Sequence, residues 1–158
     1  MNRTLSSALL VATTAVVVTA AGPATPAVSG TQPDRLTFMV EFRPFEQNFV
    51  DLGSPGPGIG DQLVFQDVLK NAKGRQVGIQ GGTCVITAPL SDGFQTHCVG
   101  TVSLADGQIS YQGLVSNAPT KQLAVVGGTG RYGNVSGEAT LVELGGDKGT
   151  LTLRIDRH

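Results

Sequence analysis

The feature that most constrains this chain is a period-two alternation of apolar and polar residues, interrupted at short intervals by glycine-containing turns. Alternation of this kind predicts β-strands that bury one face. Eight strands are predicted, near residues 35–43, 61–69, 76–88, 94–104, 107–116, 120–126, 134–144 and 147–155. Because this part of the chain shows no convincing helical pattern, we expect an all-β fold.

The turns indicate how the strands are connected. Asp92-Gly93, Asp106-Gly107 and Gly145-Gly146-Asp147 have the residue types of tight hairpin turns. Strands that are joined in this way lie side by side, and eight of them can close into an antiparallel up-and-down β-barrel of the calycin kind. Such a barrel is either filled by side chains or wide enough to hold one small ligand. A β-sandwich is the alternative architecture.

The first thirty residues differ from the rest of the chain. Arg3 is their only charge, and the apolar run 9–21 is followed by small residues of the A-x-A kind. This pattern is typical of a secretory signal peptide, and the run is shorter than the roughly 20 apolar residues that span a bilayer. An uncleaved anchor is the alternative. We predict a signal peptide over 1–27 with cleavage near 21–27, a flexible leader over 28–34, and a secreted barrel domain over 35–158.

The remaining chain is nearly neutral. Without Arg3, ten Lys and Arg face 12 Asp and Glu, which gives a net charge of −2. A neutral domain with no basic run lacks the electrostatic features that bind nucleic acid. It also lacks the polybasic stripe of a protein that binds anionic membranes. We therefore predict no nucleic-acid partner and, after cleavage, no membrane partner.

Cys84 and Cys98 are the two cysteines of the chain. Because an exported protein meets an oxidising environment, a disulfide between them is the default expectation. If Ala88 faces Phe94 across the predicted hairpin, equal steps back place Cys84 opposite Cys98, at a separation that a disulfide can bridge. A pair of buried free thiols is the alternative.

The sequence lacks complete motifs for dinucleotide binding, for hydrolysis and for metal binding. Residues 128–133 satisfy G-x-G-x-x-G, but residues 134–137 are poor helix formers, so a β-turn is favoured over a dinucleotide site. His97 and His158 are the only histidines, and the two cysteines are expected to form a disulfide, so the sequence predicts neither a hydrolase triad nor a zinc or copper cluster. The sequence predicts no metal site and no cofactor.

Two acidic residues and one loop are candidates for a functional site. Asp67 shares a strand face with Phe65, whereas Glu41 lies on the face opposite Phe38 and Val40. An acid on an apolar face is costly unless it is paired or functional. Periodicity alone favours solvent-facing positions for both acids. The Gly- and Pro-rich stretch 53–60 excludes regular structure and is either a binding loop or, as its composition favours, a mobile connector.

Several stretches resemble two plant protein families. Residues 76–86 and the tripeptide Gly53-Ser54-Pro55 are similar to segments of allene oxide cyclases, and residues 109–113, 123–132 and 137–138 are similar to both those cyclases and the dirigent proteins. The resemblance covers most of 35–155 and is most specific at the GGTG turn. It implies an eight-stranded antiparallel barrel, often a homotrimer, whose apolar cavity constrains a reactive substrate.

The resemblance also implies roles for individual residues. Glu41 falls where the cyclases keep a buried, charge-stabilising glutamate, and Asp67 falls where dirigent proteins have Asp and cyclases have Asn. Both acids would be catalytic and face the interior, so the face of Phe38 and Val40 would point outward as a subunit interface. The implied substrate-binding residues are Arg43, Ser54, Pro55, Phe65 and Arg131. Cys84 matches a cavity-lining cysteine, which a bridge to Cys98 would remove as a free thiol.

The function that the resemblance implies is the steering of a small, hydrophobic, reactive molecule through cyclisation or isomerisation. Asp67 and Arg43 replace neutral amides of the cyclases, which argues against allene oxide chemistry itself. Two alternatives stay open: a non-catalytic, lipocalin-type binder of hydrophobic ligands, and a structural barrel whose interior is plugged. An isomerase or cyclase is only slightly favoured over these alternatives.

Overall fold

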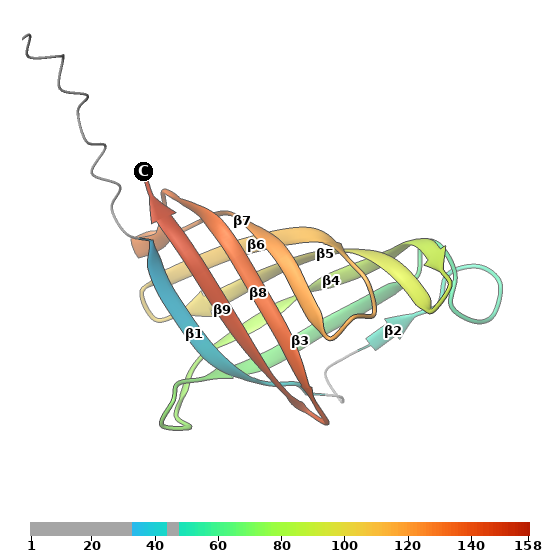
Figure 1. Cartoon of the computed structure of the whole chain (residues 1–158), viewed down its shortest axis with the longest axis horizontal. Helices are drawn as coiled ribbons and strands as arrows, with labels where there is room; N and C mark the ends of the chain where they lie inside the picture. Colours follow the sequence, from blue (N-terminus) through green and yellow to red (C-terminus); the bar gives the residue numbers. More distant parts are fainter. Residues whose placement is uncertain (1–32, 44–47) are drawn as a thin grey trace, which may run out of the picture. The chain divides into compact units, whose positions relative to one another are not determined.

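The computed structural model describes residues 33–43 and 48–158, which form nine β-strands and one 3-10 turn (Figure 1). The elements are β1 (Asp34–Glu41), β2 (Asn48–Val50), β3 (Gln62–Lys70), β4 (Gln76–Leu90), β5 (Gly93–Leu104), β6 (Gly107–Val115), β7 (Thr120–Gly128), η2 (Gly130–Tyr132), β8 (Val135–Gly145) and β9 (Lys148–Arg157). The predicted signal peptide and residues 28–32 of the predicted leader lie outside the described residues. Within the described ranges, no helix is long and apolar enough to cross a membrane.

The predicted eight-stranded antiparallel barrel is confirmed. Strands β3 to β9 follow one another as antiparallel neighbours, and β1 pairs with both β9 and β3, which closes the sheet (Figure 1). The short strand β2, which the periodicity does not reveal, pairs with the beginning of β3 through Phe49 and Leu63, on the same edge of β3 whose last residues pair with β1. Closure removes the open edges that an eight-stranded sheet would otherwise expose.

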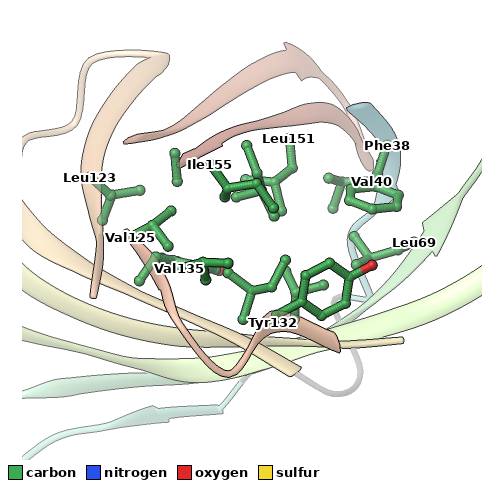
Figure 2. Close-up of a cluster of buried hydrophobic side chains, with 14 of the residues drawn as sticks. Phe38, Val40, Leu69, Leu123, Val125, Tyr132, Val135, Leu151 and Ile155 are labelled. Carbon is green, nitrogen blue, oxygen red and sulfur yellow. The ribbon is translucent and has the colours of Figure 1, made fainter. Parts of the chain in front are cut away.

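A cluster of buried apolar side chains fills one end of the barrel, where β1 begins and β9 ends; we call this the closed end. Tyr132 of η2, Val135 of β8 and Ile155 of β9 belong to this cluster (Figure 2). Other members of the cluster are Phe38, Val40, Leu69, Val102, Ile109, Val125, Ala139, Leu151 and Leu153. The cluster continues toward the other half of the barrel through Cys98, Tyr111, Val115 and Leu123, which also line the cavity described below. The opposite end, where β1 ends and β9 begins, is the open end.

The prediction for the faces of β1 is wrong. Phe38 and Val40 are 8% and 2% exposed and point into the interior beside Leu69 (Figure 2), so they do not form an outward interface. Glu41 therefore lies on the outer face. The physical reason is that burying each large apolar side chain stabilises the fold by about 1.5–3 kcal/mol, whereas burying a carboxylate carries a desolvation cost.

The predicted disulfide between Cys84 and Cys98 is confirmed, with a Cα–Cα distance of 4.0 Å. The register that leads to it differs from the one expected, because Phe94 pairs with Pro89 and not with Ala88. An irregularity between Ile86 and Ala88 takes up the extra residue and restores the pairing of the two cysteines. A β-bulge of this kind inserts one residue into one strand of a pair.

The loop between β2 and β3 is held in place by Asp61, which is fully buried. Its two carboxylate oxygens accept hydrogen bonds from the backbone N–H groups of Leu52 at 2.7 Å and Gly58 at 2.6 Å. The backbone of Asp61 in turn pairs with Ile86 of β4. The glycine- and proline-rich composition therefore belongs to a loop that a single buried side chain organises.

Candidate ligand cavity

The open half of the barrel is hollow and encloses a cavity of about 660 Å³. This volume lies within the range of about 300–1,000 Å³ that ligand pockets occupy. The apolar part of its lining comprises Phe42, Phe49, Leu63, Phe65, Cys84, Ile86, Phe94, Cys98, Val115, Leu123 and Leu141. The interior of this barrel is therefore plugged in one half and open to a ligand in the other.

Three polar side chains from three strands form the deep end of the cavity. They are Asp67 of β3, Gln80 of β4 and Tyr111 of β6, and they are 2%, 1% and 3% exposed. Gln80 Nε2 donates to Asp67 Oδ2 at 2.9 Å, and the Tyr111 hydroxyl donates to Gln80 Oε1 at 3.0 Å. Buried polar groups that satisfy one another in this way form a well-ordered network.

The network keeps Tyr111 protonated. Burial of the phenol raises the pKa of Tyr111, and the negative charge of Asp67 raises it further. Both causes act in the same direction because each one disfavours a phenolate. Tyr111 therefore enters the cavity as a neutral hydroxyl group over the whole physiological pH range.

A glycine makes room for the Tyr111 ring. Gly100 of β5 pairs directly with Tyr111 across the sheet, and a Cβ on Gly100 would lie 2.4 Å from the ring carbon Cζ. An ordinary side chain at position 100 would collide with the ring. Glycine at position 100 thus allows the Tyr111 ring to lie directly against the backbone of β5.

Charged and polar side chains surround the mouth of the cavity. Lys121 of β7 forms an ion pair of 2.7 Å with Glu143 of β8 and also donates to the carbonyl of Ala118. Asn117 accepts a hydrogen bond from the backbone N–H of Phe94 at 2.8 Å. The cavity therefore has an apolar middle between a polar mouth and a polar deep end.

The structure brings some of the predicted site residues to this cavity. Asp67 and Phe65 line it, and Asp67 faces inward as the resemblance implied. Cys84 lines it as one half of the disulfide with Cys98. The backbone N–H of Arg43 donates to Asp67 Oδ1 at 3.4 Å, so Arg43 adjoins the network through its main chain.

Other predicted residues lie elsewhere. Glu41 does not face the interior as predicted: it forms an ion pair on the outer face with Lys70, whose hydrogen bond and charge lower the pKa of Glu41. Ser54 and Pro55 are exposed in the loop after β2 and do not line the cavity. Arg131 lies at the closed end, where it forms an ion pair with Asp106 at 3.4 Å.

Sequence reasoning missed several residues of the cavity, above all Gln80 and Tyr111. A signal for Gln80 exists, because period-two alternation places it on the same face of β4 as Cys84. Counting back from the Asp106-Gly107 turn also pairs Tyr111 with Gly100. Lys121 and Glu143 carry no such signal, since charged residues near strand ends usually face solvent.

The structure describes no metal centre. Within residues 33–43 and 48–158, no group of three or more His, Cys, Asp or Glu side chains could hold a metal ion.

The described residues therefore form a closed antiparallel barrel with a cavity in one half and a buried polar network at the deep end of that cavity. The family described as "Allene oxide cyclase barrel like domain" matches residues 42–155, and the chain belongs to this family. The resemblance that the sequence motifs carry is thereby confirmed. No curated protein matches the sequence significantly.

Solved structures share the barrel. A pyocyanin demethylase is 31% identical, with a TM-score of 0.71, over 78% of this chain and 100% of that chain. A Diels-Alderase from Streptomyces koyangensis is 17% identical, with a TM-score of 0.65, over 78% of this chain and 64% of that chain. A pterocarpan synthase dirigent protein is 17% identical, with a TM-score of 0.60, over 77% of this chain and 82% of that chain. The last two comparisons establish a shared fold.

Proposed function

We propose that this chain is an exported barrel that binds a small, mainly apolar and reactive molecule and steers its cyclisation or isomerisation. The observation that carries the proposal is the cavity of about 660 Å³, whose apolar walls end on the buried network of Asp67, Gln80 and Tyr111. An apolar pocket with a few convergent polar groups is the usual form of a binding site. A barrel plugged throughout would have no such space.

In the proposed mechanism, the wall selects the conformation and the network acts on charge. Phe65 and the other aromatic side chains hold the substrate in the folded shape from which the ring closes or the bond shifts. Asp67 is the catalytic residue: its carboxylate stabilises positive charge that develops at the deep end, or accepts a proton there. Glu41, on the outer face, has no part in this mechanism.

The binding half of the proposal is tested with an uncharged fluorescent probe such as N-phenyl-1-naphthylamine. Leu141→Trp fills the cavity and should abolish the fluorescence increase that the wild type shows. Leu144→Trp is the matched control, because Leu144 lies on the same strand but is 62% exposed and does not line the cavity. If the wild type causes no increase in the fluorescence of the probe, the proposal is contradicted.

The catalytic half is tested on molecules that co-purify with the protein or on a panel of reactive polyenes and epoxides. The wild type should convert a bound substrate, and Asp67→Asn should bind it but lose turnover by about 10²–10⁴-fold, the usual contribution of acid–base catalysis. Recovery of every bound molecule unchanged from the wild type would support a non-catalytic, lipocalin-type binder.

A second candidate function is the demethylation of an aromatic compound such as pyocyanin. It is favoured by the 31% identity to the pyocyanin demethylase, which this chain matches over that protein's full length. In this reaction water would supply the oxygen with which the methyl carbon leaves as formaldehyde, and the ring system would take up two electrons. Incubation with pyocyanin should then release formaldehyde and give, after reoxidation of the ring system by air, a product lighter by one CH2 unit in a mass spectrum, and Asp67→Asn should prevent its formation. An unchanged mass after prolonged incubation would exclude this activity and leave cyclisation or isomerisation.

We also propose that the protein is exported and forms a homotrimer through the outer face of β3 to β6. The disulfide supports an oxidising destination. The outer face carries uncharged side chains at paired positions, including Val64, Thr83 and Val99, with Leu114 nearby. Sheet faces of this kind associate readily because no charge is desolvated.

Native mass spectrometry and the amino-terminal sequence of protein from the culture medium test these two points. The mature chain should begin between residues 22 and 28. The intact protein should be a trimer that Val99→Glu dissociates, whereas Met39→Glu, on the outer face of β1, should leave it intact. A wild-type monomer would contradict the assembly and leave the cavity proposal untouched.

A further inference from the structure

We infer that Tyr111 is a fixed hydrogen-bond acceptor at the deep end of the cavity, so that the barrel selects molecules presenting a hydroxyl or N–H group there over those presenting an ether or carbonyl. The inference rests on the proposed function, since it requires that a ligand fills the cavity. It specifies which functional group the ligand presents at the deep end, which the shape of the cavity alone does not determine.

The first step of the argument is the orientation of the Gln80 amide. A carboxylate accepts hydrogen bonds and donates none, so the side-chain atom of Gln80 that faces Asp67 Oδ2 at 2.9 Å must be the nitrogen Nε2. The amide oxygen Oε1 then faces Tyr111. The orientation of this amide therefore follows from Asp67, which removes the usual ambiguity between the two amide atoms.

The second step is the direction of the bond between Gln80 and Tyr111. An amide oxygen has no hydrogen to donate, so the Tyr111 hydroxyl uses its single hydrogen to reach Gln80 Oε1 at 3.0 Å. What the Tyr111 oxygen has left is acceptor capacity. Because its pKa is raised by burial and by Asp67, the hydroxyl keeps its hydrogen, and this direction persists above neutral pH.

The third step is the cost of a mismatch. Tyr111 is 3% exposed, and the middle of the cavity is lined by apolar side chains such as Leu123 and Phe65. A ligand hydroxyl or N–H at the deep end gains a hydrogen bond, whereas an ether or carbonyl sets its lone pairs against those of Tyr111. A net hydrogen bond of ordinary strength corresponds to a preference of about tenfold in the dissociation constant.

The same geometry predicts that Asp67→Asn reverses the preference. The backbone N–H of Arg43 donates to Oδ1 of residue 67, which keeps an oxygen on that side and turns the new amide nitrogen toward Gln80. Gln80 must then present Oε1 to residue 67 and Nε2 to Tyr111. The Tyr111 hydroxyl is thereby released to donate to the ligand, so that acceptor groups are favoured. Asp67 acts here as a positioning residue.

The experiment uses two probes with one skeleton, 2-naphthol and 2-methoxynaphthalene, and measures both dissociation constants by ligand fluorescence. Because the ether is the more hydrophobic probe, the readout is the ratio of the two constants relative to the ratio for Tyr111→Phe, which lacks the hydroxyl. The wild type should favour 2-naphthol about tenfold over that reference. Asp67→Asn should favour 2-methoxynaphthalene relative to the same reference.

Tyr132→Phe is the matched control, because Tyr132 is also buried but belongs to the closed end of the barrel. It should keep the wild-type ratio, and circular dichroism should show that each variant is folded. Equal ratios for the wild type and Tyr111→Phe, with both probes bound, would overturn the inference alone. A wild-type ratio in Asp67→Asn would overturn the role of Asp67 in fixing Tyr111. Failure of both probes to bind the wild type would overturn the proposed function and the inference together.

Discussion

At the scale of single residues, the deep end of the cavity depends on position 100 being a glycine, which has no side chain. Gly100 leaves the space in which the Tyr111 ring lies, and its absent Cβ would also come within 2.5 Å of the Tyr111 hydroxyl oxygen. The ring can therefore reach Gln80 only while position 100 stays glycine. Gly100 thus shapes the cavity although it offers no functional group.

Gly100→Ala should displace the Tyr111 ring and break its bond to Gln80. We expect a loss of about 1–3 kcal/mol in the free energy of unfolding, as overpacking typically costs, together with loss of the preference for 2-naphthol. Urea denaturation and the two-probe titration measure these effects. Gly58→Ala is the control, since the nearest atom to its added Cβ would be an ordinary 3.8 Å away. An unchanged probe ratio in Gly100→Ala would contradict this account.

Both tyrosines of the chain should resist ionisation. Burial raises the pKa of Tyr111 and Tyr132 above the ordinary value of 10.0, and the charges of Asp67 and Asp106 respectively add to the shift. Because the unfolded chain loses these protons first, the folded state binds more protons above about pH 10, and stability falls as the pH rises from there. Tyrosinate absorbance in the near ultraviolet should appear at a higher pH in the folded protein than in the unfolded chain. Ionisation near pH 10 with a native circular dichroism spectrum would contradict this.

At the scale of elements, the hairpin of β4 and β5 forms much of the cavity wall. Its disulfide joins residues 14 positions apart and lies among the lining side chains. The bulge near Thr87 sets the register of the open half, while the Asp92-Gly93 turn closes the hairpin. The wall is therefore fixed at the bridge, at the bulge and at the turn.

Removal of the bridge with Cys84→Ala and Cys98→Ala should lower the free energy of unfolding by about 3 kcal/mol, the value expected for a loop of this length. Chemical denaturation measures the loss, and the wild type in the presence of a reductant should approach the same stability. Cys98 is one member of the large buried apolar cluster, and the other members remain, so the barrel should still fold. Equal stability of the oxidised wild type and the double variant would refute a stabilising role.

The sequence allowed the strands, hairpins and disulfide pairing to be predicted, because alternation and turn residues are local signals. The bulge was not predictable, since nothing local marks Thr87 as the extra residue. The predicted pairing of Ala88 with Phe94 was wrong by one residue, and the bulge that was not predicted shifts the register by one residue as well. The two errors cancel, which is why the predicted cysteine pair is correct. The facing of β1 also depends on a non-local event: its pairing with both β9 and β3. The family resemblance located Asp67 in the cavity but misplaced Glu41, which an ion pair with Lys70 keeps on the outside.

At the scale of the whole barrel, most of the buried apolar cluster lies in one half and the cavity lies in the other. The buried cluster of the closed end contains Ile109, Leu153 and Ile155, whereas the open half has a cavity where a core would be. A cavity forgoes the contacts that a filled interior would make. The closed end is therefore the part of the barrel that holds the fold together.

Hydrogen exchange should reveal this division. Amides of Ile109 and Leu153 should exchange only through global unfolding, whereas those of Val115 and Leu141 near the mouth should exchange faster through local opening. A saturating ligand should slow exchange at the closed end by the full amount that binding adds to the free energy of global unfolding, and at the mouth to the extent that local opening there releases the ligand. Mass spectrometry or NMR of the protein with and without the naphthol probe provides the measurement. Uniform protection along each strand would contradict the division.

The buried cluster at the closed end has a kinetic consequence. Since that end is filled, a molecule in the cavity arrives and departs through the mouth near Lys121 and Glu143. In the proposed function, a product must leave by the path that the next substrate takes, so substrate and product exclude each other. Turnover should slow as product accumulates, and a long molecule cannot reverse its direction once inside. The end that travels in first is the end that meets Tyr111.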